Sequence, residues 1–346
     1  MRSNRFPTGR VLAAAILASC AGSAADAAEA ITWDWAIYGP PRAVTAGIET
    51  LAKAAEEKSG GNFKIKLHYG ESIAPAKEVL DALKVGAIQG ALTAFSYAPG
   101  KAPLHTVLDL PFLPIPNLEV QEKVMEDLYQ FGPVQTELAK WNAIDLCGVN
   151  LPLYEFMGTG NPPRTLEGWK GMRVRALGGG GEAMRILGAI PTSVPAPEVY
   201  TALERGTFEA ASFPFTYGFG AYRLHEVSKW YTYGFQFGFV HNAVTVSAPD
   251  YQRLPAEYKQ ILLDAKPAAY KAWRDAYAQA DQKWLPIFDQ IGLERIAFTP
   301  EMSAEVQKIA GKPVWDKWIA EMEAKKLSGR ETLDRVLAAA KKANGS

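Results

Sequence analysis

The chain has 346 residues, of which 48% are hydrophobic and 21% charged, with 37 basic and 37 acidic side chains. This length predicts two domains, and an aromatic content of 11% excludes a disordered chain. A formal net charge of zero argues against binding to nucleic acid or anionic membranes through a broad cationic surface.

The first residues have the pattern of an export signal. Three arginines precede an apolar stretch at residues 11–18, and Ala25-Asp26-Ala27 matches an A-x-A cleavage site. We therefore expect a signal peptide over residues 1–27 and a periplasmic protein. The segment ending at Cys20 also matches a lipoprotein box, so a lipid anchor on Cys20 is an alternative. The sequence has no twin-arginine pair, which favours export of the unfolded chain without a cofactor.

From residue 31 onward the apolar pattern alternates between the periods of strands and helices, which predicts an α/β fold. Thr299 followed by Pro300 is typical of a helix start. In chain order the predicted elements are strand 31–37, helix 43–58, strand 63–67, helix 75–86, strand 88–94, strand 172–177, helix 182–187, a strand region at 231–246, helix 255–285, strand 293–298 and helices from 300 and over 331–342.

One segment recurs 120 positions later in the chain. Residues 76–91 resemble residues 196–211, and between Glu78 and Gly86 five residues are identical to those at the matching offsets from Glu198 to Gly206. Each copy has the pattern of a helix, a terminal glycine and a strand. The repeat predicts two similar α/β lobes; the alternative is coincidence, because helix ends resemble one another.

Arg173 and Arg175 lie two residues apart on a predicted strand, so both side chains are expected on the same face. In open α/β folds, ligands bind beyond the carboxyl ends of strands, where Arg175 should lie. Its guanidinium matches a carboxylate with two parallel hydrogen bonds. The alternatives are a solvent-exposed position and an ion pair between lobes.

Four glycines at residues 178–181 follow this strand and precede a predicted helix. They fit a loose dinucleotide-binding pattern, but the favoured interpretation is a turn where the backbone passes a ligand or the other lobe. Aromatic residues alternate at 213–219 and at 231–239. This alternation predicts one face of an extended segment, which is either core or the wall of a pocket.

Recognisable catalytic motifs do not occur in the sequence. The four histidines lack metal-ligand spacing, and the G-x-S-x-G, H-E-x-x-H and P-loop patterns are missing. These observations favour binding over chemistry, so we expect no catalytic residue, bound metal or cofactor. An exported hydrolase or lyase acting on an organic acid is the alternative.

Several segments together resemble the DctP-type substrate-binding proteins of tripartite ATP-independent periplasmic (TRAP) transporters. The strongest is Leu166-Glu-Gly-Trp-Lys-Gly-Met-Arg-Val-Arg175, which is similar to the family's DLKGLKIR segment. The other matching segments are Leu110-Pro-Phe-Leu113, the helix at 78–86, Leu187-Gly-Ala-Ile-Pro191 and the stretch from Glu198 to Gly206.

The resemblance implies a two-lobed periplasmic-binding-protein architecture with a central ligand cleft. We place the first lobe at residues 28–151 and 240–278, and the second at 152–239 and 279–346. A helix of about 30 residues is about 45 Å long, so the helix at 255–285 would brace the hinge. Such a receptor binds a small organic acid and delivers it to a TRAP membrane permease driven by an ion gradient, with no role in nucleic-acid binding.

The family arginine that pairs with the ligand carboxylate falls on Arg175, with Arg173 in a secondary position, and further family contacts fall near Tyr154 and Phe213. Phe213 stands where many relatives carry a polar residue, which favours a carboxylate, or less readily a sulfonate, with an apolar or aromatic body. Three further side chains that follow strands or lie in turns are expected as contacts from the lobes and rim, and one aromatic on the apolar side. These are Tyr38, Tyr97, Glu71 and Phe237.

Overall fold

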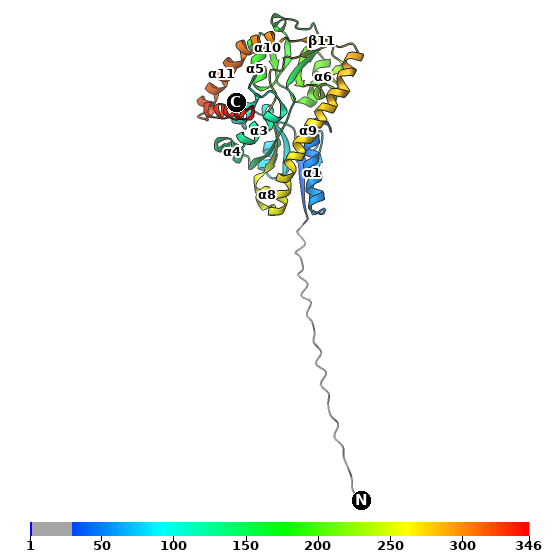
Figure 1. Cartoon of the computed structure of the whole chain (residues 1–346), viewed down its shortest axis with the longest axis vertical. Coiled ribbons are helices and arrows are strands. Elements are labelled where there is room, and N and C mark those ends of the chain that lie inside the picture. The colour runs from blue at the N-terminus through cyan, green and yellow to red at the C-terminus, as the bar shows by residue number, and fades with distance from the viewer. Residues whose placement is uncertain (2–29, 346) are drawn as a thin grey trace.

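The structure is a computed structural model that describes Met1 and residues 30–345 (Figure 1). The predicted cleavage site and Cys20 lie outside the described residues. Two separate mixed sheets, each flanked by helices, confirm the predicted two-lobed α/β class. Within the described part of the chain, no helix is long and apolar enough to cross a membrane.

The first sheet has the strand order β2-β1-β3-β10-β4. β1 is parallel to β2 and β3, whereas β10 is antiparallel to β3 and β4, between which it lies. In β2, buried Phe63 and Ile65 alternate with exposed Lys64 and Lys66, as the sequence predicts. The strands are β1 (Ile31–Ala36), β2 (Phe63–His68), β3 (Gly90–Ala94), β4 (Ala143–Val149) and β10 (Asn242–Ser247).

The second sheet has the strand order β11-β9-β5-β8-β6-β7. β6 lies between β8 and β7 and is parallel to both, so the carboxyl ends of these three strands share one edge. The strands are β5 (Tyr154–Gly158), β6 (Arg173–Arg175), β7 (Ile190–Thr192), β8 (Ala210–Pro214), β9 (Trp230–Tyr233) and β11 (Glu294–Ala297).

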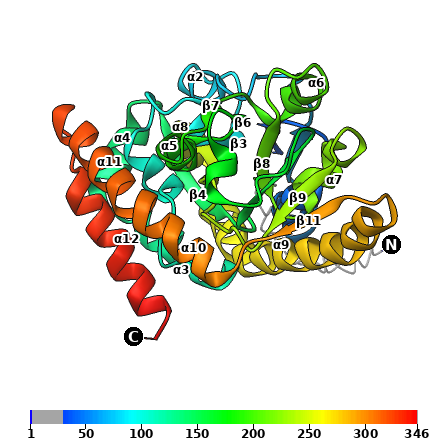
Figure 2. The same cartoon turned by 90° about the horizontal axis from the view of Figure 1, so that it is seen from above.

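The helices cover the outer faces of the sheets, and α11 and α12 form one flank of the molecule (Figure 2). α12 packs against α3, beside the first sheet. The lobe boundaries near residues 151, 239 and 278 stay predictions. The helices are α1 (Ala46–Lys58), α2 (Val79–Lys84), α3 (Leu118–Leu128), α4 (Gly132–Ala139), α5 (Gly178–Ile186), α6 (Val199–Glu204), α7 (Tyr217–Ala221), α8 (Ala248–Arg253), α9 (Ala256–Gln290), α10 (Pro300–Val306), α11 (Lys312–Ala324) and α12 (Gly329–Ala343).

The 35-residue helix α9 runs beside α1 and onward to the second sheet (Figure 1). Toward the first sheet, the Trp273 indole donates to the carbonyl of Val44 at 2.7 Å. Toward the second, the Asp281 carboxylate accepts from the Thr216 hydroxyl at 2.8 Å. The chain also passes between the sheets after β4 and after β9. These contacts confirm the prediction that a long helix lies across both lobes.

The repeat at an offset of 120 residues is confirmed. α2 and α6 begin at Val79 and Val199, and β3 and β8 begin 120 positions apart as well. Both helices end at a glycine in the left-handed region, with φ of 73° at Gly86 and 69° at Gly206. The two copies therefore build the same helix, turn and strand in different sheets.

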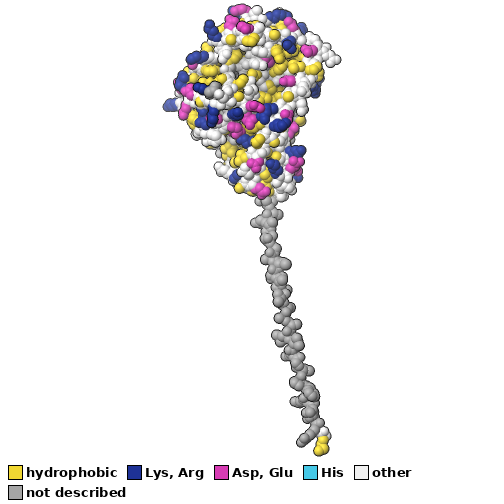
Figure 3. Space-filling model, viewed as in Figure 1, with side chains coloured by type: hydrophobic (Ala, Val, Ile, Leu, Met, Phe, Trp, Pro, Cys, Tyr) yellow, Lys and Arg dark blue, Asp and Glu magenta, His cyan; other side chains and the backbone are white. Residues whose placement is uncertain are grey.

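On the face shown in Figure 3, basic and acidic side chains are interspersed over both lobes. This arrangement agrees with the balanced charge of the sequence.

Candidate functional site

Arg175 ends β6 and is buried, with 1% of its surface exposed. Its Nε and Nη2 donate to the carbonyl of Val194 at 3.1 Å, and Nη1 donates to the carbonyl of Ser212 at 2.7 Å. Its guanidinium carbon lies 4.5 Å from the centre of the Phe213 ring. The guanidinium is thus fixed between the loop after β7 and the end of β8.

The hydrogen bonds of Arg175 leave part of its guanidinium free. A guanidinium has five N–H donors, and three bonds to backbone carbonyls leave one donor on Nη1 and one on Nη2. No carboxylate of the described residues forms an ion pair with it. Two donors on adjacent nitrogens form the fork that binds a carboxylate bidentately, and a buried charge without a partner is costly. The arrangement is suited to binding an anion.

Tyrosines from both lobes lie near Arg175. Burial raises the pKa of Tyr154 well above its usual value, and the Arg175 guanidinium opposes this shift. The rings of Tyr38 and Tyr97 meet edge to face at 5.4 Å. The Tyr38 hydroxyl accepts from the Asn242 amide at 2.6 Å, and the Tyr97 hydroxyl accepts from the Ala196 N–H at 3.0 Å. Tyr97 therefore joins the end of β3 to the segment after β7.

Phe213 and Phe237 supply apolar surface on the second lobe. Both rings are buried, and Phe213 packs under the Arg175 guanidinium. Phe237 meets Tyr154 edge to face at 6.5 Å and stacks on Phe156 at 5.4 Å. Phe213 thus lies beside the charged group, whereas Phe237 lies behind Tyr154.

Glu71 lies at the turn after β2, where its φ is 62°. Its Oε1 accepts from the Ala76 N–H at 2.5 Å, and its charge acts on the Tyr222 hydroxyl. Glu71 is half-buried. Its role as a rim contact stays a prediction.

Arg173 lies apart from these residues. Its side chain is 49% exposed, and its Nε lies 3.7 Å from the Glu209 carboxylate. Sequence spacing predicts that Arg173 shares a face with Arg175, but β6 has only three residues. Arg173 begins this strand, a two-residue step of about 6.6 Å before Arg175, and forms a surface ion pair there.

Comparison with known proteins identifies the family of this chain. The model of the bacterial extracellular solute-binding protein family 7, DctP, matches residues 39–322. The chain belongs to this family.

Relatives of the receptor are similar over most of their length. It is 28% identical over 303 residues to a monocarboxylate 2-oxoacid-binding periplasmic protein of Nostoc sp., covering 79% of each chain. It is 24% identical over 280 residues to the 2,3-diketo-L-gulonate-binding periplasmic protein of Escherichia coli, covering 75% of this chain and 80% of the relative. A TRAP periplasmic solute-binding protein of Ochrobactrum anthropi superimposes with a TM-score of 0.76 and 25% identity, over 92% and 97% of the chains. Members of the family are binding proteins for transport, not enzymes, and the hydrolase or lyase alternative is not supported.

Sequence reasoning missed Arg42 and Tyr222, which the structure brings to the DctP-family site. Arg42 follows the turn after β1, and its guanidinium carbon lies 5.0 Å from the Tyr38 ring and 5.4 Å from the Tyr222 ring. The Tyr222 ring lies 5.4 Å from Phe213. Burial raises the pKa of Tyr222 to about 12, while Arg42 and Arg175 both oppose the shift. The only signal in the sequence was that Arg42 follows a strand at the predicted edge.

The sequence predicts that the glycine run precedes the helix. In the structure the run forms the first turn of the helix, because α5 begins at Gly178. A Cβ atom on Gly179 would lie 2.6 Å from the carbonyl oxygen of Asp109, and one on Gly178 would lie 2.7 Å from the Asp109 Cβ. Glycine is needed because the start of α5 packs directly on the backbone of the first lobe. The favoured interpretation, a turn where the backbone passes a ligand or the other lobe, is wrong about the turn, but the close approach to the other lobe is observed.

The prediction of two extended aromatic segments is correct for their first residues and wrong for the rest. β8 ends at Pro214 and the chain turns into α7, while β9 ends at Tyr233. The aromatic side chains still pack against one another, with Phe213 and Phe215 both close to Phe219. Aromatic residues alternate in the sequence because most of these rings pack in the interior. Rings on helices and loops can pack there as well as rings on strands.

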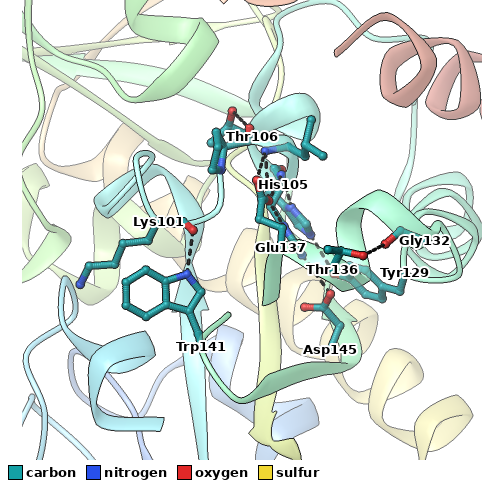
Figure 4. A network of polar contacts seen from close by, with 12 residues as sticks. Lys101, His105, Thr106, Tyr129, Gly132, Thr136, Glu137, Trp141 and Asp145 are labelled. Carbon is teal, nitrogen blue, oxygen red and sulfur yellow. Dashed lines mark hydrogen bonds and ion pairs between the residues drawn. The ribbon is translucent and has the colours of Figure 1, made fainter. Parts of the chain in front are cut away.

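A buried polar network lies in the first lobe (Figure 4). His105 contacts the carboxylates of Glu137 at 2.8 Å and Asp145 at 3.1 Å. Burial alone would lower the pKa of His105, but the two carboxylates raise it to about 9. Among residues 30–345, no group of three or more His, Cys, Asp or Glu side chains could hold a metal ion. The network therefore pairs charges within the first lobe.

Proposed function

We propose that this chain is a periplasmic TRAP receptor that binds a small organic anion through Arg175 and delivers it to a membrane permease driven by an ion gradient. The single observation that carries the proposal is the buried guanidinium of Arg175. It keeps two donors on adjacent nitrogens and has no carboxylate partner among the described residues. An anion bound there gains two charge-assisted hydrogen bonds in a site shielded from water.

The surroundings support a carboxylate with a partly apolar body. Phe213 lies under the guanidinium, the Arg175 charge acts on Tyr154, and the rings of Tyr38 and Tyr97 pack edge to face. Aromatic walls with few polar groups are typical of small-molecule sites. The relatives named above bind a 2-oxoacid and a sugar acid, which agrees with recognition of a carboxylate.

Direct contacts join the two lobes beside the candidate site, so we propose that binding and closure are coupled. Tyr97 bonds to Ala196 across the gap, and Gly179 packs on Asp109. A ligand that touches both lobes binds the closed arrangement better and shifts the population toward it. The closed form is then the one presented to the permease.

A thermal-shift screen of organic acids on the purified receptor tests the proposal. A ligand at a hundredfold excess over Kd should stabilise the protein by about 2.7 kcal/mol. Arg175→Ala should weaken binding of the hit by at least about thirtyfold, because losing one partner of a buried charge pair costs about 2–5 kcal/mol. Arg175→Lys keeps the charge but loses the planar fork, and it should also bind weakly.

Arg173→Ala is the matched control, because it removes an arginine from the same strand at an exposed position paired with Glu209. It should bind within about threefold of the parent, since exposed ion pairs contribute little. Equal affinity of the Arg175→Ala variant and the parent would overturn the assignment.

A further inference from the structure

A buried carboxylate binds the segment that follows β9, where the chain leaves the second sheet for the first. Glu155 is 1% exposed. Its Oε1 accepts from the backbone N–H groups of Gly234 at 2.8 Å and Gln236 at 3.3 Å. Its Oε2 accepts from the Thr232 hydroxyl at 2.5 Å and from the Phe235 N–H at 3.3 Å. One side chain thus binds three consecutive backbone N–H groups, at residues 234–236.

The backbone of this turn needs to be held. Gln236 has a φ of 43°, in the left-handed region that side chains disfavour. A non-glycine residue keeps such a conformation only where its surroundings fix it. Burial raises the pKa of Glu155 to about 7, and its four hydrogen bonds oppose the shift. Above pH 7 the carboxylate is ionised, and all four partners donate to it.

The residues that leave the turn contact the candidate site and the first lobe. The Phe237 ring meets Tyr154 edge to face, and it packs on the start of α5, where a Cβ on Gly180 would lie 2.3 Å from its Cε2. The Phe237 carbonyl accepts from the Phe112 N–H of the first lobe at 2.8 Å. The Gly238 carbonyl accepts from the Tyr154 N–H at 2.7 Å. The conformation of the turn therefore sets the surface behind Tyr154 and one bond to the first lobe.

We propose that Glu155 is a positioning residue of the receptor: its carboxylate fixes the turn at residues 234–236, and the turn fixes Phe237 and Tyr154 at the site. Glu155 does not touch the ligand, because adjacent residues of a strand point to opposite faces of the sheet and four protein donors occupy its two oxygens. This inference rests on the proposed function, because it takes Tyr154 as part of the ligand site.

Titration calorimetry at pH 8, with benzoate and 2-oxoisovalerate as probes, tests the inference. Glu155→Gln keeps the size of the side chain but turns an NH₂ group toward N–H donors. The affinity for a probe should fall at least about fivefold, because a buried N–H of the turn loses its acceptor. Adding Gln236→Gly should recover at least about threefold, since glycine adopts the left-handed turn without being held.

Two control variants separate this effect from general ones. Lys326→Gly also removes a side chain from a left-handed position, with a φ of 59°, but in the exposed turn between α11 and α12. Added to Glu155→Gln, it should recover no affinity. Glu209→Gln removes a 39% exposed carboxylate that accepts from the Arg173 N–H, and it should bind within about threefold of the parent. If Glu155→Gln does not fold, Glu155→Asp takes its place, because it keeps the charge and shortens the reach by one methylene group.

Amide hydrogen exchange followed by NMR gives a second readout that needs no ligand. Without its bond to a fixed Phe237 carbonyl, the Phe112 N–H should exchange at least about tenfold faster in Glu155→Gln, relative to the buried amides of β3. Gln236→Gly should slow the exchange again. A role in stability alone would lower the resistance to urea and leave both the affinity and the relative exchange of Phe112 unchanged, which would overturn the inference.

The outcomes separate this inference from the proposed function. If the parent binds a probe and Glu155→Gln binds it equally tightly, the inference is wrong and the proposed function stands. Equal recovery by Gln236→Gly and Lys326→Gly also overturns the inference. If no acid binds to the parent, the proposed function fails, and the exchange of the Phe112 N–H alone decides whether Glu155 positions the turn.

Discussion

The Tyr97 hydroxyl accepts a hydrogen bond from the backbone N–H of Ala196 at 3.0 Å, and this bond links the segment after β3 of the first sheet to the segment after β7 of the second. Tyr97 ends the turn after β3, and Ala196 precedes α6. Both residues are buried. The bond therefore joins the two lobes in this structure, and we expect it to break when they separate.

Tyr97→Phe should therefore weaken ligand binding through the loss of closure. The substitution leaves a buried N–H without a partner in the closed form, which costs about 1–3 kcal/mol, or a factor of about 5 to 150 in affinity. Titration calorimetry with the best acid measures the effect. Tyr69→Phe, which removes an exposed bond to Glu49, is the control, and equal affinity of the two variants would contradict the prediction.

Gly179→Ala should prevent close contact between the lobes. The added Cβ would lie 2.6 Å from the Asp109 carbonyl oxygen, and backbone atoms cannot move aside without separating the lobes. We expect ligand affinity to fall at least tenfold while the ligand-free protein keeps its circular dichroism spectrum. Gly132→Ala, where a Cβ meets nothing within 4 Å, should bind normally. Tight binding by Gly179→Ala would show that the contact can be relieved.

Asp109 should make the stability of the protein depend on pH. Burial raises the pKa of Asp109 from 3.8 to about 7, although bonds from Ser96 and His241 oppose the shift. Between these values the folded protein binds more protons than the unfolded chain, so stability should fall as pH rises from about 4 to about 7. Urea unfolding at several pH values measures this slope.

Asp109→Asn should flatten that slope and raise stability at pH 8, because an amide stays neutral. Part of the slope should remain, since burial also raises the pKa of Glu155 to about 7. An unchanged slope in Asp109→Asn would show that Asp109 is ionised at low pH in the folded protein.

His105 should contribute far more to stability than the surface His68. His105→Ala leaves the carboxylates of Glu137 and Asp145 buried without their cation, which typically costs about 3–5 kcal/mol. His68→Ala removes an ion pair with Asp34 that is partly exposed, and it should cost at most about 1 kcal/mol. Urea unfolding at pH 6 compares the two variants, and a similar cost for both would contradict the prediction.

The contribution of His105 to the free energy of unfolding should depend on pH. The folded pKa of His105, about 9, lies above the unfolded value of 6.5. Its contribution should be complete below pH 6.5 and should be lost as pH rises through about 9. The difference between the parent and His105→Ala should therefore shrink in alkaline buffer.

The regular elements could be predicted because their periodicity is set by burial. The alternation in β2, the caps of α10 and the repeat at Gly86 and Gly206 are local signals that the fold preserves. The position of Arg175 at the end of a strand could also be predicted, because the residue lies in a segment that resembles one family; its role in ligand binding stays a prediction. Each of these features is indicated by residues that lie close together in the chain.

The remainder depends on contacts between distant segments. The start of α5 at Gly178 depends on the backbone around Asp109, which lies in the other lobe. The position of the Arg42 side chain depends on the ring of Tyr222, also in the other lobe. The exposure of Arg173 follows from the short length of β6. No local pattern contains this information, so the sequence did not indicate that Arg42 lies beside Tyr222.

The position of β10 constrains how the molecule is assembled. This strand lies in the middle of the first sheet, between β3 and β4, yet it comes from residues 242–247. A polypeptide truncated before residue 242 would have two facing rows of unsatisfied backbone groups where that strand belongs. The N-terminal half is therefore not an autonomous folding unit, and its sheet is completed only after the intervening lobe has been synthesised.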